Sequence, residues 1–153
     1  MIQNLEPILA KHPLFADLEP EYLALIVGCT KNVRFKEGEF LLREGKQADT
    51  FYLIREGKAT VDIYASNLGA ITVHTVEAGE VLGWSWLISP YRWHFDAQAL
   101  TPIRALAIDG KCIRDKCENN KALGYELMKR FTQIIVQRLQ ATQLQLLDVY
   151  RVH

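Results

Sequence analysis

The spacing of apolar residues changes twice along the chain. From about Ile2 to Cys29 the apolar positions recur at helical spacing. Within this part, Pro20 is suited to the first position of a helix. The buried face of that helix is expected to carry Tyr22, Leu23, Leu25, Ile26 and Val27. The pattern therefore predicts helices over about residues 1–30.

Between Asn32 and Ile108 the pattern is that of short β-strands. Runs rich in β-branched and aromatic residues alternate with turns that contain glycine, such as Glu37-Gly38 and Glu56-Gly57. Strands are expected at residues 33–35, 40–43, 50–54, 59–64, 70–74, 95–100 and 103–108. Strands at this spacing predict a β-sandwich or a barrel-like roll over residues 31–108.

Helical spacing returns after Ile108 and gives C-terminal helices over about residues 109–150. Asp109 and Asn120 are suited to cap a short helix and a much longer one. In the long helix one row recurs every three or four residues: Met128, Phe131, Ile135, Leu139, Thr142 and Leu146. A second row, on a neighbouring face, contains Leu123, Leu127, Ile134 and Arg138. Because such a helix projects beyond a small roll, we expect the first row to form a homodimer seam; packing on its own domain is the alternative.

Composition and charge narrow the class of protein. The chain has 153 residues, of which 24% are charged, and its formal net charge is zero. Without a basic excess we expect no direct nucleic-acid binding and no attachment to a membrane surface. The sequence shows neither a secretory signal nor an apolar run that would span a bilayer. With its three cysteines expected as reduced thiols, the chain is predicted to be one cytoplasmic domain, residues 1–153.

All three tryptophans lie in one segment, residues 83–95, together with a proline and Arg92. Such crowding of large aromatic side chains predicts either a ligand pocket or a pocket that they fill. The candidate ligand-binding residues are Gly83, Trp84, Ser85, Trp86, Arg92 and Trp93. Amides at the start of a helical turn, the Ser85 hydroxyl and Arg92 would together hold an anion. In the alternative, Arg92 only stacks on Trp93 or Tyr91.

Glycines and apolar residues recur in two spaced patterns, Phe35-x-x-Gly38-x-x-Leu41-x-x-x-Gly45 and Phe51-Tyr52-Leu53-Ile54-x-x-Gly57. This spacing resembles the cyclic nucleotide-binding domain family, which includes the effector domains of Crp/Fnr-type regulators. The similarity covers about residues 14–149. It implies an α+β, mainly β fold: a double-stranded β-helix, or jelly-roll-like β-roll, flanked by N-terminal helices and a long C-terminal helix.

The segment that follows Gly79-Glu80-Val81-Leu82 in this chain is similar in position to the phosphate-binding cassette of the family. There, helix amides and an arginine hold the cyclic phosphate, and a glutamate accepts a ribose hydroxyl. Here Gly83 is present, but Trp84 stands in the place of the glutamate. Trp93-His94-Phe95 stands in the place of Arg-Ser/Thr-Ala, with Arg92 beside it. We therefore expect an altered pocket for a small anionic or aromatic ligand, rather than a usual cAMP or cGMP site.

Other chemistry has little support in the sequence. The histidines His12, His74, His94 and His153 lack metal-ligand spacing. Cys29 is the only cysteine in the first half, so an iron–sulfur cluster is not expected. Neither a nucleophile elbow nor a P-loop occurs. We therefore expect no enzyme, no catalytic residue, no metal, and no cofactor beyond, at most, a cyclic nucleotide.

These observations predict a stand-alone regulatory or sensor domain that signals through a dimeric C-terminal helix or to a partner protein. The alternative is the effector domain of a Crp/Fnr-type transcriptional regulator whose DNA-binding part is missing or on another chain. An enzyme on a jelly-roll scaffold is the third hypothesis, and bound metal would be its signature.

Overall fold

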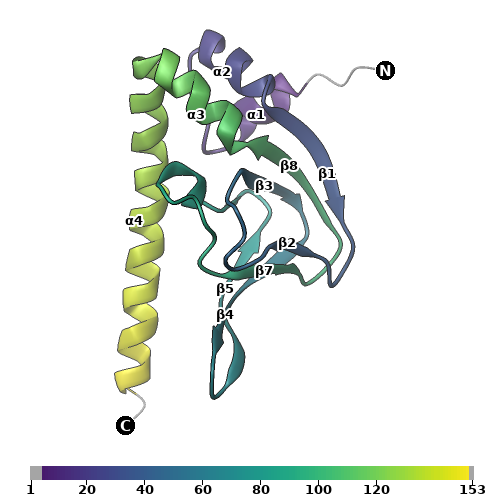
Figure 1. The fold of residues 1–153 in the computed structure, drawn as a ribbon, viewed down its shortest axis with the longest axis vertical. Helices are drawn as coiled ribbons and strands as arrows, with labels where there is room; N and C mark the ends of the chain where they lie inside the picture. The colour runs from purple at the N-terminus through teal and green to yellow at the C-terminus, as the bar shows by residue number, and fades with distance from the viewer. Residues whose placement is uncertain (1–4, 152–153) are drawn as a thin grey trace.

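The computed structural model describes residues 5–151 and consists of a β-roll flanked by helices (Figure 1). The expected helical residues from Ile2 to Asn4, and His153, lie outside the described residues. The elements follow in this order: α1 (Glu6–Lys11), α2 (Pro20–Val27), β1 (Thr30–Phe35), β2 (Phe40–Leu42), β3 (Thr50–Glu56), β4 (Lys58–Ala65), β5 (Gly69–Glu77), β6 (Val81–Leu82), the 3-10 turn η1 (Ser85–Leu87), β7 (Asp96–Ala99), β8 (Ile103–Asp109), α3 (Gly110–Asn119) and α4 (Lys121–Arg151).

Two four-stranded antiparallel sheets form the roll and confirm the predicted fold class. One has the order β1-β8-β3-β6 and the other β2-β7-β4-β5. In β3 and β8, the central strands of the first sheet, Leu53, Ile54, Leu106 and Ile108 are buried. The turn between β3 and β4 needs a glycine, because a Cβ on Gly57 would lie 2.2 Å from the carbonyl oxygen of Pro102. The strand ends differ from the predicted ones by up to three residues.

The predicted helix starts are confirmed. Pro20 is the first residue of α2. The side chain of Asp109 accepts a hydrogen bond from the amide of Cys112 at 3.0 Å, and so caps α3. Asn120 Oδ1 accepts one from the amide of Leu123 at 3.1 Å at the start of α4. These local signals therefore set the starts of the helices on both sides of the roll.

The expectation of reduced thiols is wrong for two of the three cysteines. Cys29 and Cys112 form a disulfide, with their Cα atoms 5.8 Å apart, and Cys117 is the free cysteine. Pairing of β1 with β8 sets Thr30 opposite Ile108 and so brings the end of α2 beside the start of α3. Because these two cysteines are paired, the cysteines no longer support a location in a reducing compartment. The cytoplasmic location stays a prediction; none of the helices within residues 5–151 is long and apolar enough to cross a membrane.

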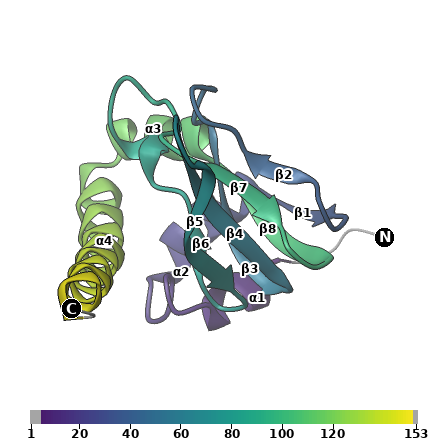
Figure 2. The same ribbon diagram turned by 90° about the horizontal axis from the view of Figure 1, so that it is seen from below.

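Helix α4 runs along one side of the roll in both ribbon views (Figures 1 and 2). Its first half is anchored by the buried residues Leu123, Leu127 and Phe131. Phe131 is 1% exposed and makes edge-on contacts with Phe51 and Trp86, both at 5.2 Å between ring centroids. The prediction that Phe131 belongs to the dimer seam is therefore wrong. Starting at Met128, steps of four and three residues lead to Thr132, Ile135, Leu139, Thr142 and Leu146, so the seam pattern passes through Thr132 instead of Phe131.

The other predicted seam residues lie outside the core. Met128, Leu139 and Leu146 are exposed, with Leu139 and Leu146 at 56%. Ile135 is half-buried. Thr142 is exposed but also lines the cavity described below, and its hydroxyl donates to the carbonyl of Arg138. The distal half of α4 thus presents apolar side chains that this chain leaves uncovered.

Candidate functional site

A cavity of about 880 Å³ lies between the roll and α4. Its walls come from the α1–α2 loop, from β4, β5 and β6, from the start of the tryptophan segment, and from residues 126–145 of α4. The apolar lining includes Leu14, Val61, Ile63, Val73, Val76, Val81, Leu82, Trp84, Phe95 and Ile134. Because α4 forms one whole wall, any molecule bound here contacts the roll and the helix together.

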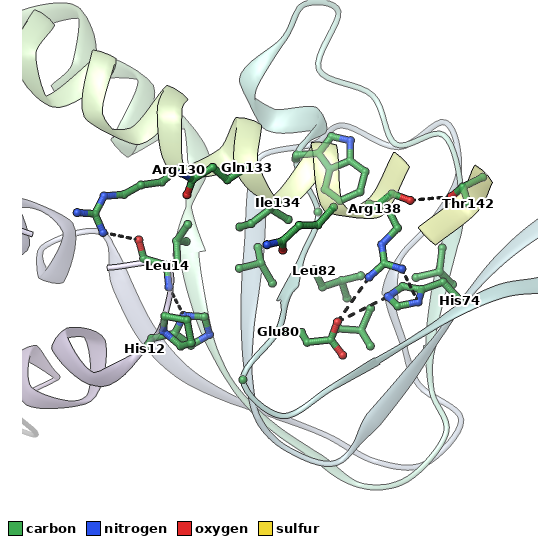
Figure 3. A pocket seen from close by; sticks show the side chains of 18 of the residues that line it. His12, Leu14, His74, Glu80, Leu82, Arg130, Gln133, Ile134, Arg138 and Thr142 are labelled. Carbon is green, nitrogen blue, oxygen red and sulfur yellow. Dashed lines mark hydrogen bonds and ion pairs between the residues drawn. The ribbon is translucent and has the colours of Figure 1, made fainter. Parts of the chain in front are cut away.

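One end of the cavity holds a cluster of three polar side chains from different elements (Figure 3). Arg138 of α4 places a guanidinium nitrogen 2.9 Å from Nδ1 of His74 on β5. Its other terminal nitrogen lies 3.5 Å from Oε2 of Glu80, which stands between β5 and β6. His74 Nε2 lies 3.9 Å from the same oxygen. The cluster therefore ties the distal part of α4 to the roll.

The protonation of His74 follows from these contacts. A guanidinium only donates, so His74 Nδ1 accepts and the neutral ring carries its proton on Nε2, toward Glu80. Burial, and then the charge of Arg138, lower the pKa of His74, while Glu80 raises it to a smaller extent. With His74 neutral, Arg138 and Glu80 balance each other in charge.

The opposite end of the cavity is held by Arg130 (Figure 3). Its guanidinium donates to the carbonyls of Leu14 and Ala16, both at 2.8 Å, and to Glu126 at 3.1 Å. Hydrogen bonds from Arg130 and Lys129 lower the pKa of Glu126. Arg130 thus fastens α4 to the α1–α2 loop and has its donors occupied by protein.

His12 lies at the same end. Its Nδ1 accepts a hydrogen bond from the amide of Leu14 at 3.1 Å, so the proton of the neutral ring is on Nε2. Nε2 is buried and has no hydrogen-bond partner among the described residues. Burial lowers the pKa of His12 to about 4. His12 is therefore an uncharged side chain of this wall at neutral pH.

Of the six predicted pocket residues, only Gly83 and Trp84 line this cavity. Trp86 is 1% exposed and stacks on Phe51 at 4.7 Å, so it belongs to the core rather than to a ligand site. Trp93 is also buried. Its ring lies against Gly83, where an added Cβ would meet Cη2 at 2.6 Å. Trp86 and Trp93 therefore pack into the core, while Gly83 and Trp84 remain at the cavity.

Ser85 and Arg92 also lie away from the cavity. Ser85 begins the three-residue turn η1, which confirms the predicted helical turn but places it outside the lining. Arg92 is exposed, and its guanidinium is 3.5 Å from the carbonyl of Gly45. The cation–π contact expected of Arg92 is made by Arg114, 4.0 Å above the ring of Tyr91. No arginine of residues 83–95 therefore faces the cavity.

The polar residues of the cavity were missing from the predicted site. His74, Glu80 and Arg138 come from three separate segments, and no motif spacing connects them. One sequence feature could have pointed to this site: Arg138 is a charged residue inside an apolar row of the long helix. Within residues 5–151 no group of three histidine, cysteine, aspartate or glutamate side chains is placed to hold a metal ion.

The comparisons with known proteins agree with this architecture. The family model for the cyclic nucleotide-binding domain matches residues 32–120, more than half of the chain. A candidate cyclic nucleotide-binding protein from Geobacter metallireducens is 33% identical, with a TM-score of 0.80; the match covers 91% of this chain and 99% of that one. Comparison with curated proteins gave no match.

Two further structures share the fold at lower identity. A cyclic nucleotide-binding domain from Methylobacillus flagellatus is 22% identical, with a TM-score of 0.79, over 94% of this chain and 81% of that one. The sensor domain of the transcriptional regulator DNR from Pseudomonas aeruginosa is 18% identical, with a TM-score of 0.71, over 88% and 91%. The family model and the Geobacter structure show that the chain belongs to the cyclic nucleotide-binding domain family.

Proposed function

We propose that this domain is a non-catalytic regulatory sensor that does not bind cAMP or cGMP in the usual way of its family. The observation that carries the proposal is the filled cassette: the ring of Trp93 lies against Gly83, and Trp84 stands where the resemblance implies a glutamate. An indole donates one hydrogen bond and accepts none, so neither tryptophan replaces a carboxylate that accepts from ribose. Losing that charge-assisted bond costs on the order of 1.5–3 kcal/mol.

The fold itself does not require a cyclic nucleotide, because function depends on the site rather than on the fold. A regulatory subunit of a protein kinase A from Trypanosoma brucei shares this fold; that kinase is described as cAMP-independent, and a triple mutant of the subunit as bound to cAMP. The alternative of an effector domain with its DNA-binding part elsewhere stays a prediction.

The cavity beside α4 supports a ligand of another kind. Its volume lies in the range of small-molecule sites, and its lining combines aliphatic side chains with a few polar groups. Side chains of α4 make contacts across it: Arg130 contacts the α1–α2 loop, Arg138 contacts the roll, and Gln145 donates a hydrogen bond to the carbonyl of Val73 on the roll at 3.4 Å. A ligand that changes any of them biases the position of the helix.

The uncovered face of α4 supports a second copy of the chain as the partner that receives this change. Met128, Leu139 and Leu146 are exposed on one side of the helix, beside the half-buried Ile135. Their positions keep the alternation of three and four residues on which paired helices depend. Association of two copies would cover this face and would make each helix sense the other.

Thermal unfolding in the presence of cyclic nucleotides tests the proposal. A ligand present at a thousand times its dissociation constant stabilises a protein by about 4 kcal/mol, which raises the melting temperature by several degrees. We expect no such rise with millimolar cAMP or cGMP. A rise of this size with either nucleotide would overturn the proposal.

A further inference from the structure

We propose that Arg138 is the anion-binding residue of the cavity and that Glu80 occupies its guanidinium until a ligand arrives. The ligand class is a small molecule with one anionic group, such as a carboxylate, attached to an apolar body. This inference rests on the proposed function and deepens it, because it names the ligand chemistry and the contact through which binding acts on α4.

The charges of the cluster define what the anion must displace. Arg138 and Glu80 neutralise each other, and His74 is neutral. An incoming anion beside Glu80 would set two negative groups on one guanidinium, an arrangement that like-charge repulsion disfavours. The side chain of Glu80 is 39% exposed, so its carboxylate has solvent to turn toward. The anion therefore replaces Glu80 rather than joining it.

The other two cations that line the described cavity are committed elsewhere. Arg130 donates to the carbonyls of Leu14 and Ala16 and to Glu126, and these bonds hold the α1–α2 loop. Lys129 pairs with Glu126 at 3.3 Å and lies over the ring of Tyr125. Breaking these contacts would undo the attachment of α4 to the loop. Arg138 also contacts His74, but its charged partner is the partly exposed carboxylate of Glu80, which a ligand carboxylate can imitate.

The apolar body of the ligand fits the middle of the cavity. Leu82 and Ile134 lie between the two polar ends in Figure 3. Val61, Val73, Val76 and Phe95 continue this apolar lining along the roll. A molecule anchored on Arg138 by its anionic group would bury its apolar part there, which favours binding in proportion to the area removed from water.

The exchange of anions acts directly on the helix. In the free protein the contact from Arg138 to Glu80 joins α4 to the turn between β5 and β6. A ligand anion that takes over Arg138 releases that tie and substitutes its own apolar contacts with the roll. Occupancy of the cavity thus changes one of the contacts that position the distal part of α4, beside those of Arg138 with His74 and of Gln145 with Val73.

Titration calorimetry with naphthalene-1-acetate and with the uncharged naphthalene-1-ethanol tests this inference. The two probes share the apolar body and differ in the anionic group. We expect the acid to bind at least tenfold more tightly than the alcohol to the wild-type domain. Arg138→Gln should remove this preference, whereas Arg92→Gln, which changes an exposed arginine outside the cavity, should leave it intact.

Glu80→Gln gives an independent test. The amide keeps an oxygen that can accept the bond from the amide of Glu77, now made to Oε1 of Glu80 at 3.0 Å, but it removes the competing charge. The acid should therefore bind about tenfold more tightly to this variant, with the affinity of the alcohol unchanged. Circular dichroism and the affinity of the alcohol report whether each variant is folded, and Arg138→Lys keeps a positive charge if Arg138→Gln is not.

Three outcomes would overturn the inference while leaving the proposed function in place. They are equal affinity of the acid and the alcohol, no binding of the acid at millimolar concentration, and weaker binding of the acid to Glu80→Gln. Binding of cAMP in the family manner would instead overturn the proposed function, whatever the naphthalene probes do.

Discussion

The ring of Trp93 lies against Gly83 so closely that a Cβ on Gly83 would be 2.6 Å from Cη2 of the indole. These residues stand near the two ends of the segment that resembles a phosphate-binding cassette. Their contact packs the end of this segment against its first glycine. The close contact also explains why position 83 requires a glycine, in addition to the backbone φ of +99° there.

This packing predicts the effect of Gly83→Ala. The new methyl group would force the indole out of its place and would also suffer the left-handed backbone conformation, for a loss of about 3 kcal/mol in the free energy of unfolding. Gly69→Ala is the matched control, since Gly69 has a φ of +76° but open space around it. It should lose only about 1 kcal/mol. Equal losses in urea unfolding would show that Trp93 does not press on Gly83.

The exposed face of α4 predicts the oligomeric state. The wild-type domain should be a dimer by light scattering, and Leu139→Asp should make it a monomer because a charge would enter the seam. Leu144 is also exposed but lies about 140° further round the helix, so Leu144→Asp should remain a dimer. A monomeric wild-type protein, or the same mass for both variants, would remove the proposed seam.

The disulfide predicts which thiols react. Alkylation of the unfolded protein without reductant should label Cys117 alone, and labelling after reduction should add Cys29 and Cys112. Mass spectrometry distinguishes the two results. Because the bond closes a loop with a sequence separation of 83, its reduction should lower the free energy of unfolding by about 4 kcal/mol. Three labelled cysteines without reductant would contradict the pairing.

His12 predicts a loss of stability in mild acid. Its pKa in the folded domain is about 4, below its ordinary value of 6.5, so the unfolded chain binds the proton more readily between these values. The contribution of His12 to the free energy of unfolding is complete above about pH 6.5. It falls by on the order of 2 kcal/mol as the pH decreases toward 4, a value reduced because the ring is partly exposed.

His12→Asn isolates this effect. Its side-chain oxygen can still accept from the amide two residues ahead, as Nδ1 of His12 does from Leu14, but the amide does not titrate. The difference in unfolding free energy between wild type and variant should therefore shrink or reverse on acidification from about pH 7 to pH 4. A difference that stays constant over this range would contradict the assignment.

The order of elements could be predicted because its signals are local. Pro20, Asp109 and Asn120 mark helix starts through their own backbone or side-chain chemistry. The turn glycines mark corners, as Gly57 does where a side chain would strike Pro102. Such features act within a few residues of chain, and periodicity between them is enough to separate strands from helices.

The site was predicted less well because its residues meet only in the folded chain. Arg138 and His74 are 64 residues apart, and Cys29 and Cys112 are 83 apart. The tryptophan segment was predicted to be an altered cassette, and composition alone left open whether its rings line a pocket or fill it. Packing decides this: Trp86 and Trp93 enter the core, and only Trp84 remains at the cavity.

The tryptophan segment leads us to propose that this domain does not bind cyclic nucleotides in the usual way of its family. Titration calorimetry of cAMP into the wild-type domain near neutral pH tests this proposal most directly. We expect only the heat of dilution, with no binding tighter than micromolar. A saturating isotherm with a dissociation constant below micromolar would contradict it.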